Sequence, residues 1–434
     1  MNCRKLLMAV LCAAGAASCA DAQMVYLNEN MLDYYSNPYR GRGERTSDAR
    51  LEALQMSYAI DDEASQFTLE GWADNRAGLA DSQKNYVKVN AGGQTGDLHD
   101  SNDYTGGNLG AYMRAGGWEL EGGYTAQKIK NSSGDDTYDS PAAGIGYGHS
   151  FGNLSAGAHA NFERGNYESD VNYNINSAGV GGAYKLDLGG TVVDMGTTLD
   201  YVARGNQTSF YTRPLHGANI GAAAIASVGS GLKAGLRASF APLSGDCTGT
   251  MDGVTKKSDP KTLGARVQYL FSAIPLTLVG DFSRYYENPR YSAASYISYK
   301  TGSNLFTGGA ALKLLDGKLL VGTELQKLEL TQEMLGTGPS TYRDDVTNIT
   351  GGAEYYITQT VALRGSFRRM KYRSWYEATP DNVTENKSNS FAFGAGYKGE
   401  KALVDLTFKY VKDNLDTDSE DKYKGLWLTA SFPF

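Results

Sequence analysis

Apolar and polar residues alternate along most of the chain from about residue 51 onward. Between Leu232 and Phe240, apolar residues occupy every second position, and Lys233 and Arg237 are among the residues between them. The same alternation recurs over 263–271, 276–283 and 361–368. A period of two is typical of a β-strand whose two faces meet different environments. The pattern therefore predicts an all-β chain.

The predicted strands are joined alternately by very short turns and by longer polar segments. Turns such as Gly116-Gly117 and Asp316-Gly317 supply the positive φ angles that tight hairpins need. The longer segments are 128–140, 164–174, 241–261, 286–303, 327–345, 372–387 and 411–423. This asymmetry is typical of a transmembrane antiparallel up-and-down β-barrel with short periplasmic turns and longer extracellular loops.

The last strand carries the most specific pattern in the chain. Every second residue back from the C-terminus is apolar, and the chain ends on an aromatic residue; these residues are Leu426, Leu428, Ala430, Phe432 and Phe434. The segment resembles the C-terminal recognition strand of porins and other outer-membrane β-barrel proteins of Gram-negative bacteria. The resemblance implies insertion into the bacterial outer membrane by the barrel-assembly machinery, among outer-membrane lipid and lipopolysaccharide. It leaves the choice between a monomer and a homo-oligomer open.

The alternation predicts roughly 18 strands if the segment 85–90 is the first of them. Two further segments, 54–60 and 67–73, have alternating apolar residues and would bring the number to about 20. Both counts stay open at this point. A barrel of either size is wide enough to enclose a water-filled lumen.

The N-terminus has the features of an export signal. Arg4 and Lys5 precede a short apolar stretch, and Ala20-Asp21-Ala22 fits the small-x-small cleavage rule. A lipoprotein signal ending at Cys19 is the alternative. The chain is therefore divided into a cleaved signal peptide (1–22), a periplasmic segment or small hatch (23–50) and the transmembrane barrel (51–434). The segment 23–50 is too short for the plug domain of a TonB-dependent transporter.

Charge and cysteine content exclude several other classes. The net charge is −7 and no basic cluster is present, which argues against nucleic acid as a partner. Three of the four cysteines lie in the signal segment, so Cys247 alone remains and no disulfide framework is expected. Its polar surroundings predict an exposed loop thiol.

The alternation also predicts which charged side chains point into the lumen. They are Arg114, Glu119, Glu121, Asp194, Asp200, Lys233, Arg237, Arg266, Asp281, Lys313, Glu324, Arg364, Arg368, Asp405 and Lys409. Isolated charges are too costly in a dry interior, so a charged lumen implies water. The leading hypothesis is a porin-like channel for passive diffusion of small hydrophilic solutes. Alternatively, these charges pair across strands and only satisfy one another.

Two other functions are kept as alternatives. A hatch-gated channel for hydrophobic substrates, as in the long-chain fatty-acid channels, would use the segment 23–50 as its hatch. A non-transport surface or adhesion protein would use the long acidic loops. The loops 241–261 and 286–303 are both candidates for an inward constriction.

Catalysis and bound cofactors are not expected. His149 and Ser150 are adjacent in a predicted strand, so they face opposite sides and cannot form a catalytic pair. His99, His159 and His216 are interpreted as ordinary polar positions. The glycine motif at 394–399 lacks a following helix, and the acidic segment 416–421 lacks the glycine and glutamate of a calcium loop. No metal site is predicted.

Overall fold

The structure is a computed structural model that describes residues 49–56, 67–73, 75–81, 85–98, 102–131, 134–167, 172–207, 210–293, 298–335, 340–378, 383–414 and 420–434. The predicted signal peptide (1–22) and nearly all of the segment 23–50 lie outside these ranges. The described part of the chain forms a closed antiparallel barrel of 18 strands, which confirms the all-β fold class and the lower of the two predicted counts.

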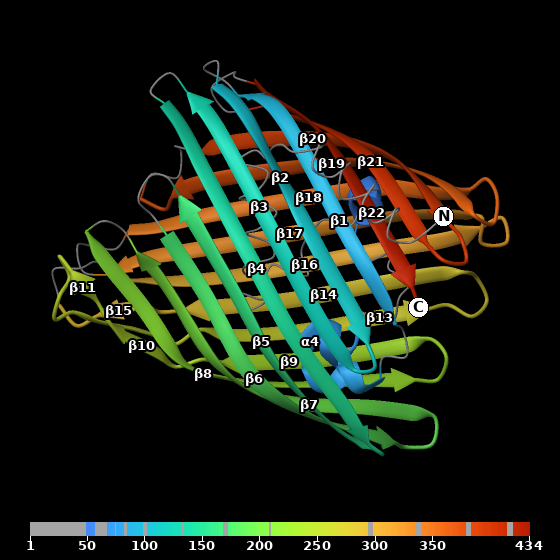
Figure 1. Cartoon of the computed structure of the whole chain (residues 1–434), viewed down its shortest axis with the longest axis horizontal. Helices are drawn as coiled ribbons and strands as arrows, with labels where there is room; N and C mark the ends of the chain where they lie inside the picture. The colour runs from blue at the N-terminus through green and yellow to red at the C-terminus, as the bar shows by residue number, and fades with distance from the viewer. Residues whose placement is uncertain are drawn as a thin grey trace.

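The wall strands follow one another in chain order around the barrel (Figure 1). They are β1 (Tyr86–Leu98), β2 (Asn102–Ala115), β3 (Trp118–Asn131), β4 (Gly134–Phe151), β5 (Leu154–Tyr167), β6 (Asn172–Asp187), β7 (Thr191–Gln207), β8 (Tyr211–Val228), β9 (Leu232–Phe240), β13 (Lys261–Leu270), β14 (Leu276–Glu287), β16 (Ser298–Leu314), β17 (Leu319–Leu335), β18 (Ser340–Tyr356), β19 (Val361–Tyr376), β20 (Thr384–Lys398), β21 (Leu403–Asn414) and β22 (Glu420–Pro433).

The first and last strands close the sheet. β1 pairs with β22 from Tyr86↔Pro433 to Asp97↔Lys422, in addition to its pairing with β2. Closure removes the sheet edge, and a β-sheet can pair all its backbone polar groups inside hydrocarbon only in that form. The last strand that carried the sequence resemblance is thus the strand that completes the barrel.

The outer face has the apolar surface of a membrane-spanning barrel. Leu236 is 64% exposed and Phe393 is 63% exposed, values that fit contact with lipid better than contact with water. Aromatic residues such as Trp118 and Tyr397 lie near the short turns, and Tyr201 and Phe240 lie farther along their strands. Tyr and Trp are typical of the two interfaces of a bilayer. Among the described residues, no helix has the length and apolar character needed to cross a membrane.

Most of the predicted long loops are extended strands. The segment 327–345, for example, consists mainly of the ends of β17 and β18, which pair from Lys327↔Thr347 to Met334↔Ser340. A tilted strand needs about 9–11 residues to cross the hydrocarbon, whereas β4 and β8 have 18 each. The strands therefore continue beyond the bilayer with polar residues on both faces.

The segment 241–261 extends the wall and does not fold inward as a constriction. It forms a hairpin from β10 (Leu243–Asp246), β11 (Thr248–Gly249) and β12 (Thr255–Ser258). β10 pairs with β8 and β12, and β12 pairs with β15 (Arg290–Tyr291). Cys247 in this hairpin is 1% exposed and packs with Met251 and Val254. The prediction of an exposed thiol is therefore wrong, because the hairpin has a small core of its own.

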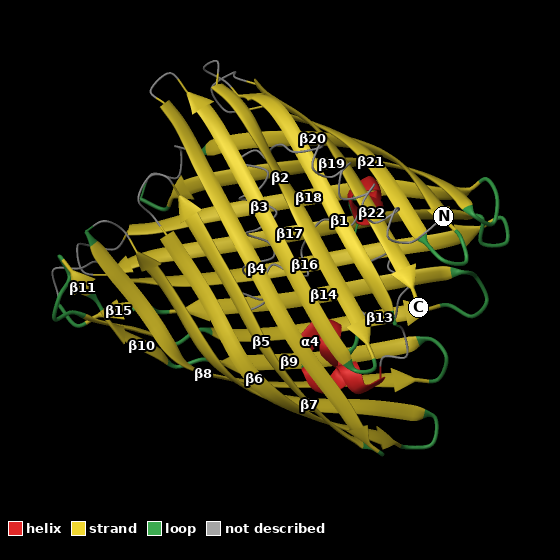
Figure 2. Cartoon of the chain, viewed as in Figure 1, coloured by secondary structure: helices red, strands yellow, loops and turns green. Residues whose placement is uncertain are grey.

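Within the described ranges, three short helices lie inside the barrel, toward the end with the short turns (Figure 2). They are α3 (Ala49–Leu54), α4 (Leu69–Ala73) and the 3₁₀ helix η2 (Arg76–Asp81). The predicted strands at 54–60 and 67–73 are therefore wrong in their described parts. The wall begins at Tyr86 and not at residue 51. We call the described residues between 49 and 81 the hatch.

Candidate functional site: the lumen and its hatch

The hatch contacts opposite walls of the lumen through inward-facing residues. Helix α3 lies against β18 to β22, whereas α4 and η2 lie against the walls formed by β4 to β8. These two groups of strands are on opposite sides of the closed sheet (Figure 1). The hatch therefore reaches across the lumen.

Buried ion pairs hold α3 to its wall. The Arg50 guanidinium donates to both carboxylate oxygens of Glu354, at 3.0 and 2.9 Å. Glu354 also accepts from Arg364, which in turn donates to Asp405. The side chains of Glu354, Arg364 and Asp405 are all at most 5% exposed. This chain of four charged groups links the hatch to three strands of the wall.

Hydrogen bonds to the backbone of α3 complete this contact. The Ala49 amide donates to the Thr429 hydroxyl at 2.8 Å, and the Ser366 hydroxyl donates to the Ala53 carbonyl at 2.7 Å. Arg368 donates to the Gln55 carbonyl at 3.1 Å. The first amides and last carbonyls of a helix have no partners within the helix. Here the wall supplies them.

Apolar and aromatic packing holds α4 to the opposite wall. Phe67 and Trp72 pack edge to face with ring centroids 5.3 Å apart, and both join a buried cluster with Leu69 and Ile225. The Trp72 indole also donates to Asp281 at 3.1 Å. Two predicted lumen residues lie over these rings: Arg237 is 5.0 Å from the Trp72 ring and Arg266 is 4.9 Å from the Phe67 ring.

Glycines on the inner wall let the hatch approach the sheet closely. A β-carbon at Gly157 or Gly148 would lie closer than 3.0 Å to the Arg76 backbone in η2. A β-carbon at Gly235 would meet the rings of Trp72 and Phe67, the former at 2.9 Å. Any other residue at these positions would push the hatch away from the wall. Part of the high glycine content thus forms a cradle for the hatch.

Polar contacts at η2 fix the second half of the hatch. The Asn75 side chain donates to the carbonyls of Gly182 (3.0 Å) and Thr197 (3.3 Å) in the wall. Arg76 lies 3.3 Å from Glu119, which Arg114 also contacts at 3.0 Å. The wall carboxylate Glu119 is therefore shared by one arginine of the hatch and one of the barrel.

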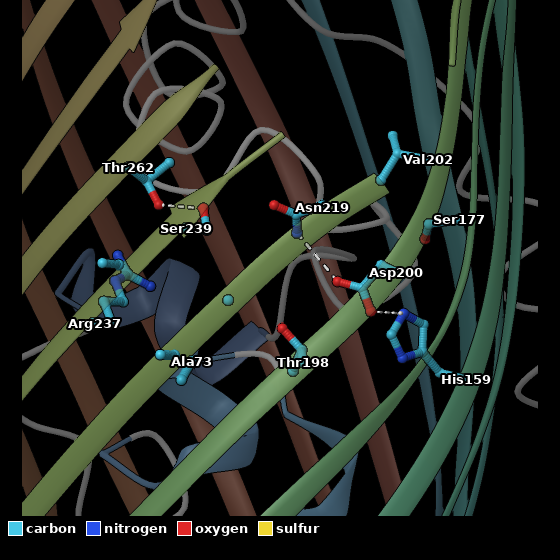
Figure 3. A pocket seen from close by; sticks show the side chains of 13 residues that line it. Ala73, His159, Ser177, Thr198, Asp200, Val202, Asn219, Arg237, Ser239 and Thr262 are labelled. Carbon is cyan, nitrogen blue, oxygen red and sulfur yellow. Dashed lines mark hydrogen bonds and ion pairs between the residues drawn. The ribbon is translucent and has the colours of Figure 1, made fainter. Parts of the chain in front are cut away.

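A small polar cavity of about 60 Å³ lies beside α4 on the inner wall. Asp200 accepts from Asn219 at 3.1 Å and lies 3.7 Å from His159, as Figure 3 shows. Ser239 and Thr262 share a hydrogen bond of 2.6 Å at the other side of the cavity. The cavity has room for only one or two waters. It presents carboxylate, imidazole, amide and hydroxyl groups next to the hatch.

Buried apolar side chains lie on the inward face of the wall, farther from the short turns than the hatch does. One buried cluster joins Leu305, Leu328, Val346 and Met370 from β16 to β19. A second joins Val202, Leu215, Ala241 and Leu243 around β7, β8 and β10. These side chains lie on the inner face of their strands. In β17, for example, Leu328 lies on the same face as buried Glu324 and on the face opposite to exposed Leu325. The inner wall thus changes from charged and glycine-rich near the hatch to partly apolar farther out.

The mouth of the lumen at the hairpin carries a group of cations. Arg213 lies 4.1 Å from the Tyr211 ring, and Arg204 forms an ion pair with Glu287. Burial, followed by the nearby Arg204 charge, lowers the pKa of Lys256 to about 8. A lysine in this position is therefore partly neutral near physiological pH.

The structure brings several predicted lumen residues together and separates others. Arg114 pairs with Glu119, Arg364 pairs with Asp405, and Arg237, Arg266 and Asp281 surround the aromatic rings of α4. The remaining predicted residues lie apart from these groups. Lys409 is 5.6 Å from the Trp427 ring, Glu324 accepts a hydrogen bond from Gln326 at 2.9 Å, and Arg368 donates to the Gln55 carbonyl after α3. Glu121 is buried, Asp194 and Lys233 are partly exposed, and Lys313 is exposed near a short turn.

The residues that the sequence did not point to are mostly those of the hatch. Arg50, Trp72, Asn75 and Arg76 were not singled out, because nothing in their local pattern indicates a partner more than 40 residues away. Glu354 had a usable signal. It shares the alternation of Gly352 and Thr350 in β18, which would have placed it in the lumen.

The histidines do not gather at one place. His159 lines the polar cavity, His149 stacks on Tyr147 and packs edge to face with Phe151, and His216 is exposed. His99 lies outside the described residues. Within the described ranges, no group of three or more His, Cys, Asp or Glu side chains has the spacing of a metal site.

These features define the class: the described part of the chain is a closed β-barrel with the apolar outer face of a membrane-spanning barrel, and its lumen holds short helices of the same chain. No known protein family and no curated protein matches the sequence. Solved structures of similar fold include CymD, a monoaromatic hydrocarbon channel, at 12% identity over 89% of this chain and 97% of that chain, with a TM-score of 0.38.

Two further barrels are similar to the same degree. The toluene transporter TodX of P. putida is 12% identical over 89% of this chain and 98% of its own, with a TM-score of 0.38. The alcaligin receptor FauA of Bordetella pertussis is 9% identical over 81% of this chain and 76% of its own, with a TM-score of 0.38. Likeness at this level carries no argument about what this chain transports.

Proposed function

We propose that this protein is a hatch-gated outer-membrane channel for small solutes that have both an apolar part and a polar group. The observation that carries the proposal is the position of the hatch, which bridges opposite walls of the lumen through buried contacts. A freely open pore for passive diffusion would not need buried ion pairs across its interior. The alternative of hatch-gated transport therefore replaces the open porin as the leading hypothesis.

The two kinds of inner wall support the proposed solute class. The clusters around Leu328 and Leu215 place apolar side chains, buried in this state, on the inward face of the wall, so a solute that displaces the groups covering them would meet an apolar surface. The cavity at Asp200 and His159 then offers hydrogen-bonding partners directly beside α4. A solute that fills both regions would compete with the hatch for the same wall.

A channel for purely hydrophilic solutes is the second candidate. The polar lining of the cavity at Asp200 favours it, because that lining would accept hydrogen bonds from, or donate them to, one polar group of a hydrophilic solute equally well. The two candidates differ in whether an apolar group on the solute raises flux.

Both the gate and the solute class are tested by one experiment on proteoliposomes. We expect deletion of residues 49–81 to raise single-channel conductance by at least about tenfold, because the hatch fills the narrow part of the lumen. With the full-length chain, flux of benzoate should exceed flux of glucose. Unchanged conductance after deletion would contradict the hatch, whereas equal flux of the two solutes would favour the hydrophilic channel.

A further inference from the structure

The wall of the barrel has one interrupted region, on the side of β9, β13 and β14. β9 continues into β10 through Ala241-Pro242, β13 is the continuation of β12 through Asp259-Pro260, and β14 continues toward β15 through Asn288-Pro289. The pairing register is the same on both sides of each break, as Phe240↔Lys261 and Leu243↔Ser258 show. The three breaks therefore lie side by side at one level of the wall.

Proline explains why the ladder stops here. It has no backbone N–H, so the three prolines each remove one donor from the ladder at the same level of the wall. The Ala241 amide still donates to the Pro260 carbonyl at 2.9 Å, so the strands remain adjacent. A cavity of about 500 Å³ opens at this level.

Position places the cavity at the outer edge of the lipid-facing surface. Phe240, the last apolar residue of β9, is 41% exposed on the outside of the barrel. Its pairing partner on β13 is Lys261, which faces outward too. The Lys261 ammonium lies 5.5 Å from the Phe240 ring and 5.8 Å from the Tyr286 ring. Aromatic and basic residues in this order mark the zone of lipid head groups.

The cavity is lined by two cations and several hydroxyl groups. Lys257 and Arg290 are partners across the ladder between β12 and β15, and the Arg290 side chain is 61% exposed. Ser244, Ser258 and Ser292 lie around them. Paired cations at a head-group position favour phosphate, which accepts charge-assisted hydrogen bonds from Lys and Arg.

One acceptor atom of a cavity-lining residue, and one in the neighbouring break of β14, have no donor among the described residues. They are Oδ1 of Asp259 and Oδ1 of Asn288, both buried. The other carboxylate oxygen of Asp259 lies 3.5 Å from Lys261 and 3.9 Å from Arg290. A buried acceptor without a donor costs free energy, so these atoms favour a ligand that brings hydroxyl or amide donors.

We propose that this cavity binds the head group of a phosphorylated glycolipid of the outer leaflet. The Lys257 and Arg290 side chains bind its phosphate, and Asp259 and Asn288 accept hydrogen bonds from its sugar hydroxyl or amide groups. The acyl chains continue down the apolar surface below Phe240. Lys257 and Arg290 lie on the outward face of the wall, so the proposed head-group site is independent of the proposed channel function.

Lipid A titrated into the detergent-solubilised full-length barrel, followed by native mass spectrometry, tests the proposal. The variant is Lys257→Gln/Arg290→Gln. Its matched control is Lys371→Gln/Lys387→Gln, which removes two exposed charges that Glu385 already neutralises at 2.8 and 3.0 Å. All four side chains are exposed, so both variants should fold.

We expect one tightly bound diphosphorylated lipid A per barrel, with affinity reduced by at least about tenfold in Lys257→Gln/Arg290→Gln and unchanged in the control, because two charge-assisted contacts are lost. Dephosphorylated lipid A should bind as weakly as the variant does. Equal binding by all three proteins would overturn the proposal. So would displacement of lipid A by an equimolar soluble glucosamine phosphate, since the site would then recognise a free sugar phosphate.

Discussion

The hatch is held by two walls with different chemistry. On the β18–β22 side, α3 is bound by the Arg50–Glu354–Arg364–Asp405 chain and by hydrogen bonds to its backbone. On the β4–β9 side, α4 and η2 are bound by packing of Phe67 and Trp72, by close approach at glycines and by the buried Arg76–Glu119 ion pair. The first side thus has a chain of four charged groups, whereas the second combines a single hatch ion pair with aromatic packing.

This difference between the two walls indicates which part of the hatch can detach first. Losing one partner of a buried ion pair leaves a charge uncompensated, so the polar contact is either complete or strongly unfavourable. Apolar contacts weaken in proportion to the area exposed. We therefore infer that opening starts at α3, with α4 and η2 as the side that stays attached.

The largest effect is expected from Glu354→Gln. It leaves Arg50 and Arg364 facing a neutral amide, which should weaken docking of α3 by about 3 kcal/mol. Hydrogen exchange of the amides of α3 should become faster, with little change in α4. The double variant Arg50→Met/Glu354→Gln should recover part of the loss, because no hatch cation is then left unpaired. Equally faster hydrogen exchange in α3 and α4 would contradict the inferred difference between the two walls.

A smaller effect is expected on the other wall from Gly157→Val. The new side chain meets the Arg76 and Ala77 backbone, so overpacking should cost about 1–3 kcal/mol of η2 docking. Gly308→Val is the matched control, since a β-carbon there meets nothing within 4 Å and Gly308 lies on the exposed face of β16. Exchange should speed up in η2 and α4 and stay unchanged in α3. If the control behaved like Gly157→Val, strand propensity would explain the result and the cradle would not.

The sequence predicted the barrel because lipid and lumen impose opposite demands on alternate residues. Arg237, Arg266 and Asp281 belong to three neighbouring strands, and in each strand the alternation of apolar and polar residues places them on the inner face, where all three lie. The last strand was predicted for the same reason. The ends of the strands were not predicted, because in water a paired strand can carry polar residues on both faces, as β17 and β18 do beyond Lys327.

The hatch could not be predicted because its contacts are set by the closed barrel. Leu54 and Met56, and later Phe67 and Leu69, alternate as they would in strands. Their segments form one-turn helices because the lumen supplies partners that the local sequence does not, such as Glu354 for Arg50. The predicted charges were interpreted as a pore lining, whereas Arg364 and Asp405 pair with each other and with the hatch contact Glu354.

The smallest effect is expected from Trp72→Phe. It keeps most of the packing with Phe67 but removes the indole donor to Asp281, which should cost about 1 kcal/mol of α4 docking. The measurement is again exchange of α4, with Trp118→Phe on the lipid-facing surface as control. A loss as large as that from Glu354→Gln would mean that α4 also depends on a polar contact, and the two walls would no longer differ.

We infer that movement of α3 away from its wall opens the lumen. A β-carbon at Gly394 would lie 2.8 Å from that of Ala53, so Ala53→Cys/Gly394→Cys can form a disulfide after a shift of about 1 Å toward the usual spacing. Cys247→Ser removes the remaining thiol of the described chain. The single variants Ala53→Cys and Gly394→Cys are the controls.

Benzoate flux through the full-length double-cysteine barrel in proteoliposomes, measured before and after reduction, is the most direct test. We expect flux in the oxidised state below about one tenth of that in the reduced state, since a cross-linked α3 cannot leave the lumen. The single-cysteine controls should be insensitive to reductant. Equal flux of the double variant in both states would contradict the claim that the hatch is the gate.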